Sequence, residues 1–368
     1  MKNLKRLMIL AALLTAAAAA TAFHIPRPTL PDRTGPSIGD ARVWGYQLQH
    51  ARPDRIAAAI DVLVIDYARG STPRETLSAA EVQRFKNRPD GSKRIVLAYL
   101  SIGEAENYRY YWWSHWRMRP PRWLADENAE WKGNFRVRFW DPGWRNIIMN
   151  PRPTLLDFAM ERTVDWHKPY LDRILEAGFD GIYLDRVDAY EEWKKSRPSA
   201  EMDMAGLVIE LATYAKTQRP GFLIVTQNGE ELLRHNDIRR VIDAAAKEDL
   251  WFGIDGTEVA NSARDVSRSI LHLNRMRADG KPVLVVEYLA DPEKIHSVQR
   301  QAGDRGYIAT FAPRPLDKPP EVFRTPLLST APTTPNVLPQ GPPPTTPTAT
   351  LPSRPLAPVP ARPKEEQE

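Results

Sequence analysis

The stretch AGFDGIYLDRVDAY, residues 177 to 190, contains the unit that decides the fold. Gly178 ends a helical segment, Leu156–Ala177, because glycine readily adopts the left-handed conformation in which helices stop. The apolar run Gly181–Asp185 is short and rich in Ile, Tyr and Leu, which predicts a buried strand that ends in a carboxylate. A helix, a buried strand and a polar strand end, in this order, indicate a parallel α/β sheet.

The same unit recurs along the chain. A second helical segment, Met202–Gln218, stops at Pro220-Gly221, and the segment after the first strand, YQLQHARPDR, lacks the G-x-G-x-x-G motif of a doubly wound dinucleotide fold. We therefore predict a (β/α)₈ TIM barrel. Its eight strands are expected at Val43–Leu48, Val62–Asp66, Ile95–Ser101, Gly181–Asp185, Leu223–Asn228, Ile242–Glu248, Val283–Tyr288 and Tyr307–Ala312.

One segment interrupts this alternation. After the third strand, residues Asn107 to Trp144 are dense in Trp and Tyr and precede the next helix. Long ordered segments of this kind in compact domains usually serve function. We interpret it as an aromatic-rich insertion, an ordered loop that covers the mouth of the barrel.

The two ends differ in composition from the body. Residues 1–22 have a basic start, an apolar run and an A-x-A site, which predicts a signal peptide, although an uncleaved anchor is an alternative. A linker (23–39), the barrel (40–316) and a Pro-rich disordered tail (317–368) follow. The protein is thus expected to be exported, periplasmic or secreted, without stable membrane insertion after cleavage.

Composition excludes several classes of site. The chain has no cysteine, so disulfide frameworks, thiolate zinc sites and cysteine nucleophiles are excluded. The net charge of +5 would suit nucleic acid, but three of these charges belong to the basic start of the signal peptide. Of the remainder, residues 313–368 carry six Lys/Arg against five Asp/Glu, so about +1 belongs to the body. We expect no nucleic-acid partner.

Carboxylates gather at the predicted strand ends, which form the active face of a TIM barrel. Acidic clusters of this kind serve divalent cations or glycoside hydrolysis. No histidine pair has metal-binding spacing, so we expect neither a metal nor a cofactor. Aromatic residues at the strands suit sugar rings, but the same residues also suit a core.

Several strings resemble glycoside hydrolase family 114, the endo-α-1,4-polygalactosaminidase-like barrels. They are LAYLSIGEAENYRYYW (97–112), FDGIYLDRVDAY (179–190), VTQNGEELL (225–233), AAAKEDLWF (244–252) and VLVVEYL (283–289), with WKGNFRVRFWDPGWRNII in the insertion similar to the bacterial branch. The resemblance implies a barrel that acts on an α-1,4-linked, galactosamine-rich polysaccharide. It also implies a catalytic pair, with Asp185 as nucleophile and Glu248 as general acid/base.

Further residues at the mouth are expected to bind substrate: Asp66, Tyr99, Glu104, Arg109, Tyr183, Asp188, Gln227, Asn228, Glu287 and Tyr288. Alternatives remain for two of them, since Asp188 would also suit a helix cap and Glu104 would also suit an ion pair with Arg109. Arg186 departs from the family pattern, and it would lower the pKa of Asp185 if it bent inward. Asp66, Glu104, Asp188 and Glu287 are expected to attract a cationic amino sugar.

These observations favour an exported endo-glycosidase, a monomer that hydrolyses galactosamine- or N-acetylgalactosamine-rich exopolysaccharide with two carboxylates. An alternative from a different class is a catalytically silent barrel that binds polysaccharide and is tethered to a cell-envelope assembly through its Pro-rich tail. A deacetylase or lyase would need a metal triad or another base, which the histidine pattern disfavours.

Overall fold

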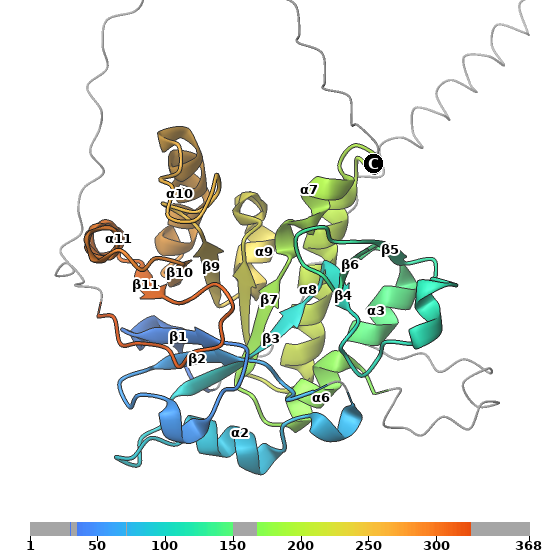
Figure 1. Ribbon diagram of the computed structural model, residues 1–368, viewed down its shortest axis with the longest axis horizontal. Helices are drawn as coiled ribbons and strands as arrows, with labels where there is room; N and C mark the ends of the chain where they lie inside the picture. The colour runs from blue at the N-terminus through green and yellow to red at the C-terminus, as the bar shows by residue number, and fades with distance from the viewer. Residues whose placement is uncertain (1–29, 31–34, 71, 150–167, 325–368) are drawn as a thin grey trace, which may run out of the picture. The chain divides into compact units, whose positions relative to one another are not determined.

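The computed structural model describes residue 30 and residues 35–70, 72–149 and 168–324. The predicted signal peptide, most of the linker and the tail from residue 325 onward lie outside the described residues. At the centre is an eight-stranded parallel sheet, nearly closed into a barrel, in the order β1-β2-β3-β7-β8-β9-β10-β11 (Figure 1). Its strands are β1 (Trp44–Gln47), β2 (Val62–Ile65), β3 (Ile95–Ser101), β7 (Gly181–Asp185), β8 (Leu223–Gln227), β9 (Ala244–Glu248), β10 (Val283–Glu287) and β11 (Ile308–Phe311).

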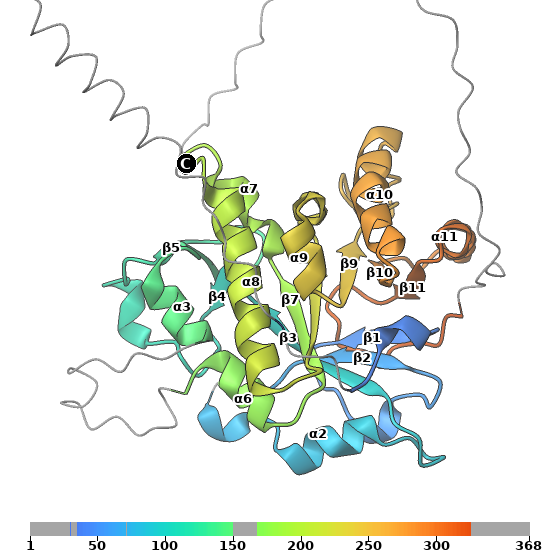
Figure 2. The ribbon, with the colours of Figure 1, turned by 180° about the vertical axis from the view of Figure 1, so that it is seen from behind.

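Each of the eight predicted strands is confirmed, with bounds that differ by at most two residues at either end. The prediction of a TIM barrel is confirmed as well. Helices surround the sheet on its outside, as the views from the front and from behind show (Figures 1 and 2). They are α2 (Ala79–Lys86), α6 (Tyr170–Glu176), α7 (Tyr190–Trp193), α8 (Ala200–Gln218), α9 (Asn236–Val241), α10 (Ala263–Ala278) and α11 (Pro292–Arg305).

The two helix ends predicted from glycine and proline are also confirmed. α6 ends at Glu176, two residues before Gly178, which has φ 80°, and α8 ends at Gln218, before Pro220 and Gly221. The first part of the predicted segment Leu156–Ala177 falls within 150–167, outside the described residues. None of the helices in the described part of the chain is long and apolar enough to cross a membrane.

Side chains alternate along each strand between two packed layers. One layer lies between the sheet and the helices, and the other fills the barrel. Inside the barrel, the rings of Trp44, Tyr46 and Tyr183 contact one another with centroids 5.1 to 6.1 Å apart. These large rings fill the interior below the strand ends, so the polar residues at those ends lie at the mouth.

The seam between β1 and β11 is covered by the chain that follows β11. The indole of Trp44 donates to the carbonyl oxygen of Ile308 at 2.9 Å, and the backbone N–H of Leu48 donates to the carbonyl of Leu316. Pro320 packs on Gly45 so closely that a Cβ at Gly45 would lie 2.5 Å from the proline ring. A glycine is therefore required at this point of β1.

The insertion after β3 was predicted as a loop, but it contains its own sheet. β4 (Glu104–Glu106), β6 (Asn134–Val137) and β5 (Leu124–Glu127) pair antiparallel in this order, with the short helices η4 (Ser114–Arg117) and α3 (Pro142–Ile148) beside them. Most of its aromatic side chains form a core for the insertion. The ring of Trp123, for example, lies 5.0 Å from that of Trp116 and 5.1 Å from that of Trp144.

Candidate active site

Inward-facing polar residues end three neighbouring strands at the mouth of the barrel. β7 ends in Asp185, β9 ends in Glu248, and β8 lies between them and ends in Gln227. Two residues earlier on each strand, the inward positions hold Tyr183, Val225 and Ala246, which belong to the interior layer. The two-residue period of a strand therefore directs all three polar side chains into the barrel.

Asp185 accepts three hydrogen bonds. Tyr99 on β3 donates its hydroxyl to Oδ2 at 2.7 Å, and Oδ1 accepts the Gln227 side-chain amide at 2.8 Å and the backbone N–H of Arg186 at 2.7 Å. The orientation of the Gln227 amide is fixed because its oxygen accepts the hydroxyl of Tyr183 at 2.6 Å. These donors hold the carboxyl in one position and favour its ionised form.

Glu248 is held from two sides. The Asn228 side-chain amide donates to Oε1 at 2.7 Å, and the Tyr288 hydroxyl donates to Oε2 at 2.9 Å. The amide oxygen of Asn228 accepts both the Lys247 ammonium group, at 3.2 Å, and the backbone N–H of Glu248, at 3.3 Å. Asn228 therefore presents its N–H₂ group, and only that group, to the carboxylate.

Burial and electrostatics couple these two carboxyls. Removal from water and the negative charge of Glu248 raise the pKa of Asp185 to about 7, against the opposing effect of the hydrogen bond from Tyr99. Arg186 was expected to lower this pKa if its side chain bent inward, but its guanidinium pairs with Glu104 and only its backbone N–H contacts Asp185. The protonation of Asp185 consequently depends on the charge of Glu248.

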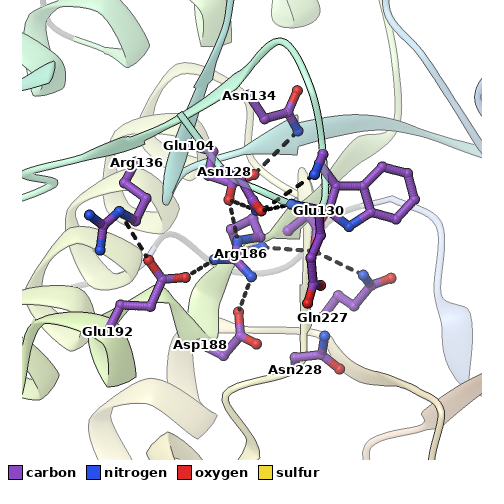
Figure 3. Close-up of polar contacts among 12 residues, drawn as sticks. Glu104, Asn128, Glu130, Asn134, Arg136, Arg186, Asp188, Glu192, Gln227 and Asn228 are labelled. Atoms are coloured by element: carbon purple, nitrogen blue, oxygen red, sulfur yellow. Dashed lines mark hydrogen bonds and ion pairs between the residues drawn. The ribbon is translucent and has the colours of Figure 1, made fainter. Parts of the chain in front are cut away.

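Arg186 connects the strand of Asp185 to the insertion (Figure 3). Its backbone is in the left-handed region, with φ 58°, and its guanidinium lies among three carboxylates. It pairs with Glu104 of β4 at 3.2 Å, with Glu192 of α7, and more distantly with Asp188 at 3.9 Å. Glu192 also lies 3.8 Å from Arg136 of β6, so this ion-pair network links the barrel with the inserted sheet.

We expect Arg186→Ala to destabilise the fold by about 2 kcal/mol, since Glu104, only 2 % exposed, would lose its cation. Arg186→Gly is the matched variant, because glycine adopts positive φ freely while alanine does not. Denaturant unfolding of both variants separates the two contributions. The difference between them measures backbone strain, and the loss they share measures the ion pairs. If both variants unfold with free energies within 0.5 kcal/mol of the parent, the ion pairs of Arg186 do not stabilise the fold.

The structure separates Asp66 and Arg109 from the carboxyl pair. The Arg109 guanidinium, 4 % exposed, pairs with Asp66 at 2.8 Å and with Glu106 at 2.7 Å. The predicted pairing of Arg109 with Glu104 is therefore wrong, and Glu104 accepts instead from Arg186 and from the side-chain amides of two asparagines. Asp66 and Glu104 each form an ion pair with an arginine, so neither carboxylate is free to bind substrate.

Two further residues that were predicted to bind substrate, Glu287 and Asp188, have other surroundings than predicted. Glu287 is fully buried on the outer side of β10, where its Oε1 accepts the backbone N–H of Trp251 at 2.8 Å. It therefore does not reach the mouth. Asp188 does not cap a helix, because no side-chain cap bond is present at either short helix beside it. Its Oδ1 is buried and accepts no hydrogen bond from the described residues.

The tip of the inserted hairpin, between β5 and β6, was not predicted from the sequence. Its signal is a pair of turn-forming residues, Asn128 and Gly133, which separate the strands LADE and NFRV. Asn128 donates its side-chain amide to Glu104 at 2.7 Å. The hairpin tip is thus attached to the residue that pairs with Arg186, beside the carboxyl pair.

Comparisons with known proteins agree with this architecture. The model of glycoside-hydrolase family GH114 matches residues 27–325. An uncharacterized protein of Methanocaldococcus jannaschii is 34% identical over 284 residues, which cover 75% of this chain and 73% of that protein. An uncharacterized protein of Deinococcus radiodurans is 32% identical over 299 residues, 79% of this chain and 86% of its own. Among solved structures, the glycoside hydrolase domain of PelA from Pseudomonas aeruginosa is similar in fold, with TM-score 0.52, 20% identity and coverage of 76% of this chain and 96% of that one.

Proposed function

This chain belongs to glycoside-hydrolase family GH114, and we propose that it cleaves an α-1,4-linked galactosamine- or N-acetylgalactosamine-rich exopolysaccharide internally, by a two-carboxylate mechanism. The observation that carries the proposal is the pair of Asp185 and Glu248, which face inward at the ends of β7 and β9, on either side of β8, and interact so that Glu248 raises the pKa of Asp185. Hydrolysis of a glycosidic bond requires one protonated and one ionised carboxyl on opposite sides of that bond. Two carboxyls at the ends of strands that flank β8 can supply this pair.

The roles within the pair are those that the resemblance to the family implies. The hydrogen bonds from Tyr99, Gln227 and the Arg186 backbone hold the Asp185 carboxyl in place and oppose the effect of its burial. We assign Asp185 as the nucleophile that attacks the anomeric carbon, and Glu248 as the acid that protonates the leaving oxygen. Glu248 then acts as the base that activates the water which hydrolyses the glycosyl intermediate.

Export is part of the proposal. It rests on residues 1–22, which have the composition of a signal peptide and lie outside the described residues. An exopolysaccharide substrate and an exported enzyme are consistent with each other, because such a polymer is found outside the cytoplasm.

The experiment that tests this function is the release of reducing ends from purified galactosamine-rich and N-acetylgalactosamine-rich polymers. Endo cleavage gives a rapid fall in polymer size with few reducing ends, whereas exo cleavage releases single sugars from the start. Binding of both polymers without any release would contradict the proposal. It would make the barrel a polysaccharide-binding module.

The raised pKa of Asp185 predicts an acidic limb in the pH dependence of catalysis. kcat/KM reports the free enzyme, and it should fall about tenfold per pH unit below pH 7, where the nucleophile Asp185 becomes protonated and no longer attacks the anomeric carbon. The measurement uses fully N-acetylated oligomers, since a free amine on the substrate would itself titrate. A rate that stays constant down to pH 5 would contradict a nucleophile with a raised pKa.

A further inference from the structure

The tip of the β5–β6 hairpin is organised by one asparagine. The side-chain oxygen of Asn128 accepts the backbone N–H of Glu130 at 2.9 Å and that of Trp131 at 3.4 Å. Its side-chain nitrogen donates to Glu104 at 2.7 Å. Turns closed by an asparagine in this way have a defined backbone, so the positions of the next two side chains are set as well.

A continuous chain of polar contacts connects this tip to the carboxyl pair. Asn128 binds Glu104, Glu104 pairs with Arg186, and the backbone N–H of Arg186 donates to Asp185 (Figure 3). Asn134, on the other side of the turn, donates a second amide to Glu104 at 3.2 Å. The insertion therefore holds its tip at a fixed place beside the mouth of the barrel.

Glu130 differs from the other acids near the mouth. Its carboxylate pairs with no Lys or Arg among the described residues, whereas Asp66 and Glu104 each pair with an arginine. Figure 3 shows its side chain pointing from the tip toward the end of β8, where Gln227 and Asn228 lie. An uncompensated, exposed carboxylate is thus directed at the strand between Asp185 and Glu248.

Two exposed aromatic residues lie at the hairpin tip that carries Glu130. Trp131 is 51% exposed and Tyr108 is 46% exposed, while the aromatic residues that form the core of the insertion are mostly buried. Both residues contact Asn134. The Tyr108 hydroxyl lies 3.3 Å from its side chain, and the Trp131 carbonyl accepts its backbone N–H at 3.1 Å. Exposed flat rings beside polar groups suit the apolar faces of sugar rings.

We propose that Glu130 is a substrate-binding residue that holds the ammonium group of an unacetylated amino-sugar unit next to the scissile bond, with Trp131 stacking on a sugar of the same chain. This inference rests on the proposed function, because it names the substrate that the site selects. An N-acetyl group would remove the positive charge and leave Glu130 without a partner, so the enzyme favours a unit with a free amine. Among the acids predicted to attract the amine, Asp66 and Glu104 pair with arginines and Glu287 lies on the outer side of β10, so Glu130 takes over that role.

The test compares the parent with Glu130→Gln, a variant of equal shape at an exposed position. The substrates are galactosamine oligomers with free amines and the same oligomers after full N-acetylation. We expect Glu130→Gln to raise KM for the free amines about 10- to 100-fold with kcat changed by less than threefold, and to leave KM for the acetylated oligomers nearly unchanged. High salt should raise KM for the free amines in the parent but not in the variant, because salt screens exposed charges.

Glu293→Gln on α11 is the matched control, since Glu293 is an exposed carboxylate outside the sheet, and it should leave both KM values unchanged. Equal effects of Glu130→Gln on both substrates, or no effect on either, would overturn the inference. Binding of a galactosamine trisaccharide to Glu248→Gln, with and without Glu130→Gln, provides a readout without turnover. If the chain hydrolyses no polymer but its binding of the trisaccharide depends on Glu130, only the proposed function is contradicted. If the chain hydrolyses polymer without any dependence on Glu130, only this inference is contradicted.

Discussion

Asp185→Asn and Glu248→Gln each lower kcat/KM for polymer cleavage by about a thousandfold or more, and neither lowers the melting temperature. The loss follows because each variant leaves one carboxyl where hydrolysis needs two. Stability is retained because either change removes one of two carboxyls whose mutual repulsion raises the pKa of Asp185. Reducing-end release and thermal unfolding of the three proteins measure both effects.

The two roles can be told apart with a substrate whose leaving group needs no proton. An aryl glycoside with a nitrophenolate leaving group should restore the first step in Glu248→Gln but not in Asp185→Asn, since only the latter lacks the nucleophile. Glu287→Gln is a matched control, because it makes the same chemical change at the end of a neighbouring strand, on the side away from the mouth. Full activity in either Asp185→Asn or Glu248→Gln would remove that residue from the mechanism.

Glu287→Gln becomes more stable relative to the parent as the pH rises, by about 4 kcal/mol between pH 4 and pH 8. Burial raises the pKa of Glu287 to about 8, whereas an unfolded chain loses this proton near its ordinary value, about 4.3. The raised pKa contributes stability that is complete below the unfolded value and is lost as the pH rises through about 8. Glutamine has no such dependence, and its oxygen can still accept the Trp251 N–H.

Denaturant unfolding of the parent and Glu287→Gln at several pH values between 4 and 8 measures this difference. Glu293→Gln, which replaces an exposed carboxylate, should show no comparable trend. Parallel stability curves for the parent and Glu287→Gln would mean that Glu287 ionises normally in the folded chain. In that case its buried Oε2, which has no hydrogen-bond partner among the described residues, would need another explanation.

The barrel could be predicted because its strands are buried on both faces. Such strands appear in sequence as short apolar runs, and β3, whose seven residues are all buried, is the clearest example. Helix ends were predictable for a similar reason, since Gly178 marks a local backbone requirement. The polar ends of β7 and β9 could be predicted as well, because both apolar sequence runs finish on a carboxylate.

The inserted sheet and the ion-pair partners could not be predicted in the same way. β4 has only three residues, and it pairs with β6 across about 30 residues of chain, so no local period marks it. The pairing of Arg109 with Asp66 rather than Glu104 depends on how the insertion folds back over β2. Long-range contacts of this kind leave no trace in the spacing of a single sequence.

By itself, the sequence determined the eight strands, their order along the chain and the strand ends that carry Asp185 and Glu248, because burial and backbone conformation act on neighbouring residues. Only the tertiary structure decided which acids remain uncompensated at the mouth. It paired Glu104 with Arg186, directed Glu287 away from the barrel interior and pointed Glu130 toward the end of β8. The physical reason is that the charge a site presents depends on distances between residues far apart in the chain, and these distances exist only after folding.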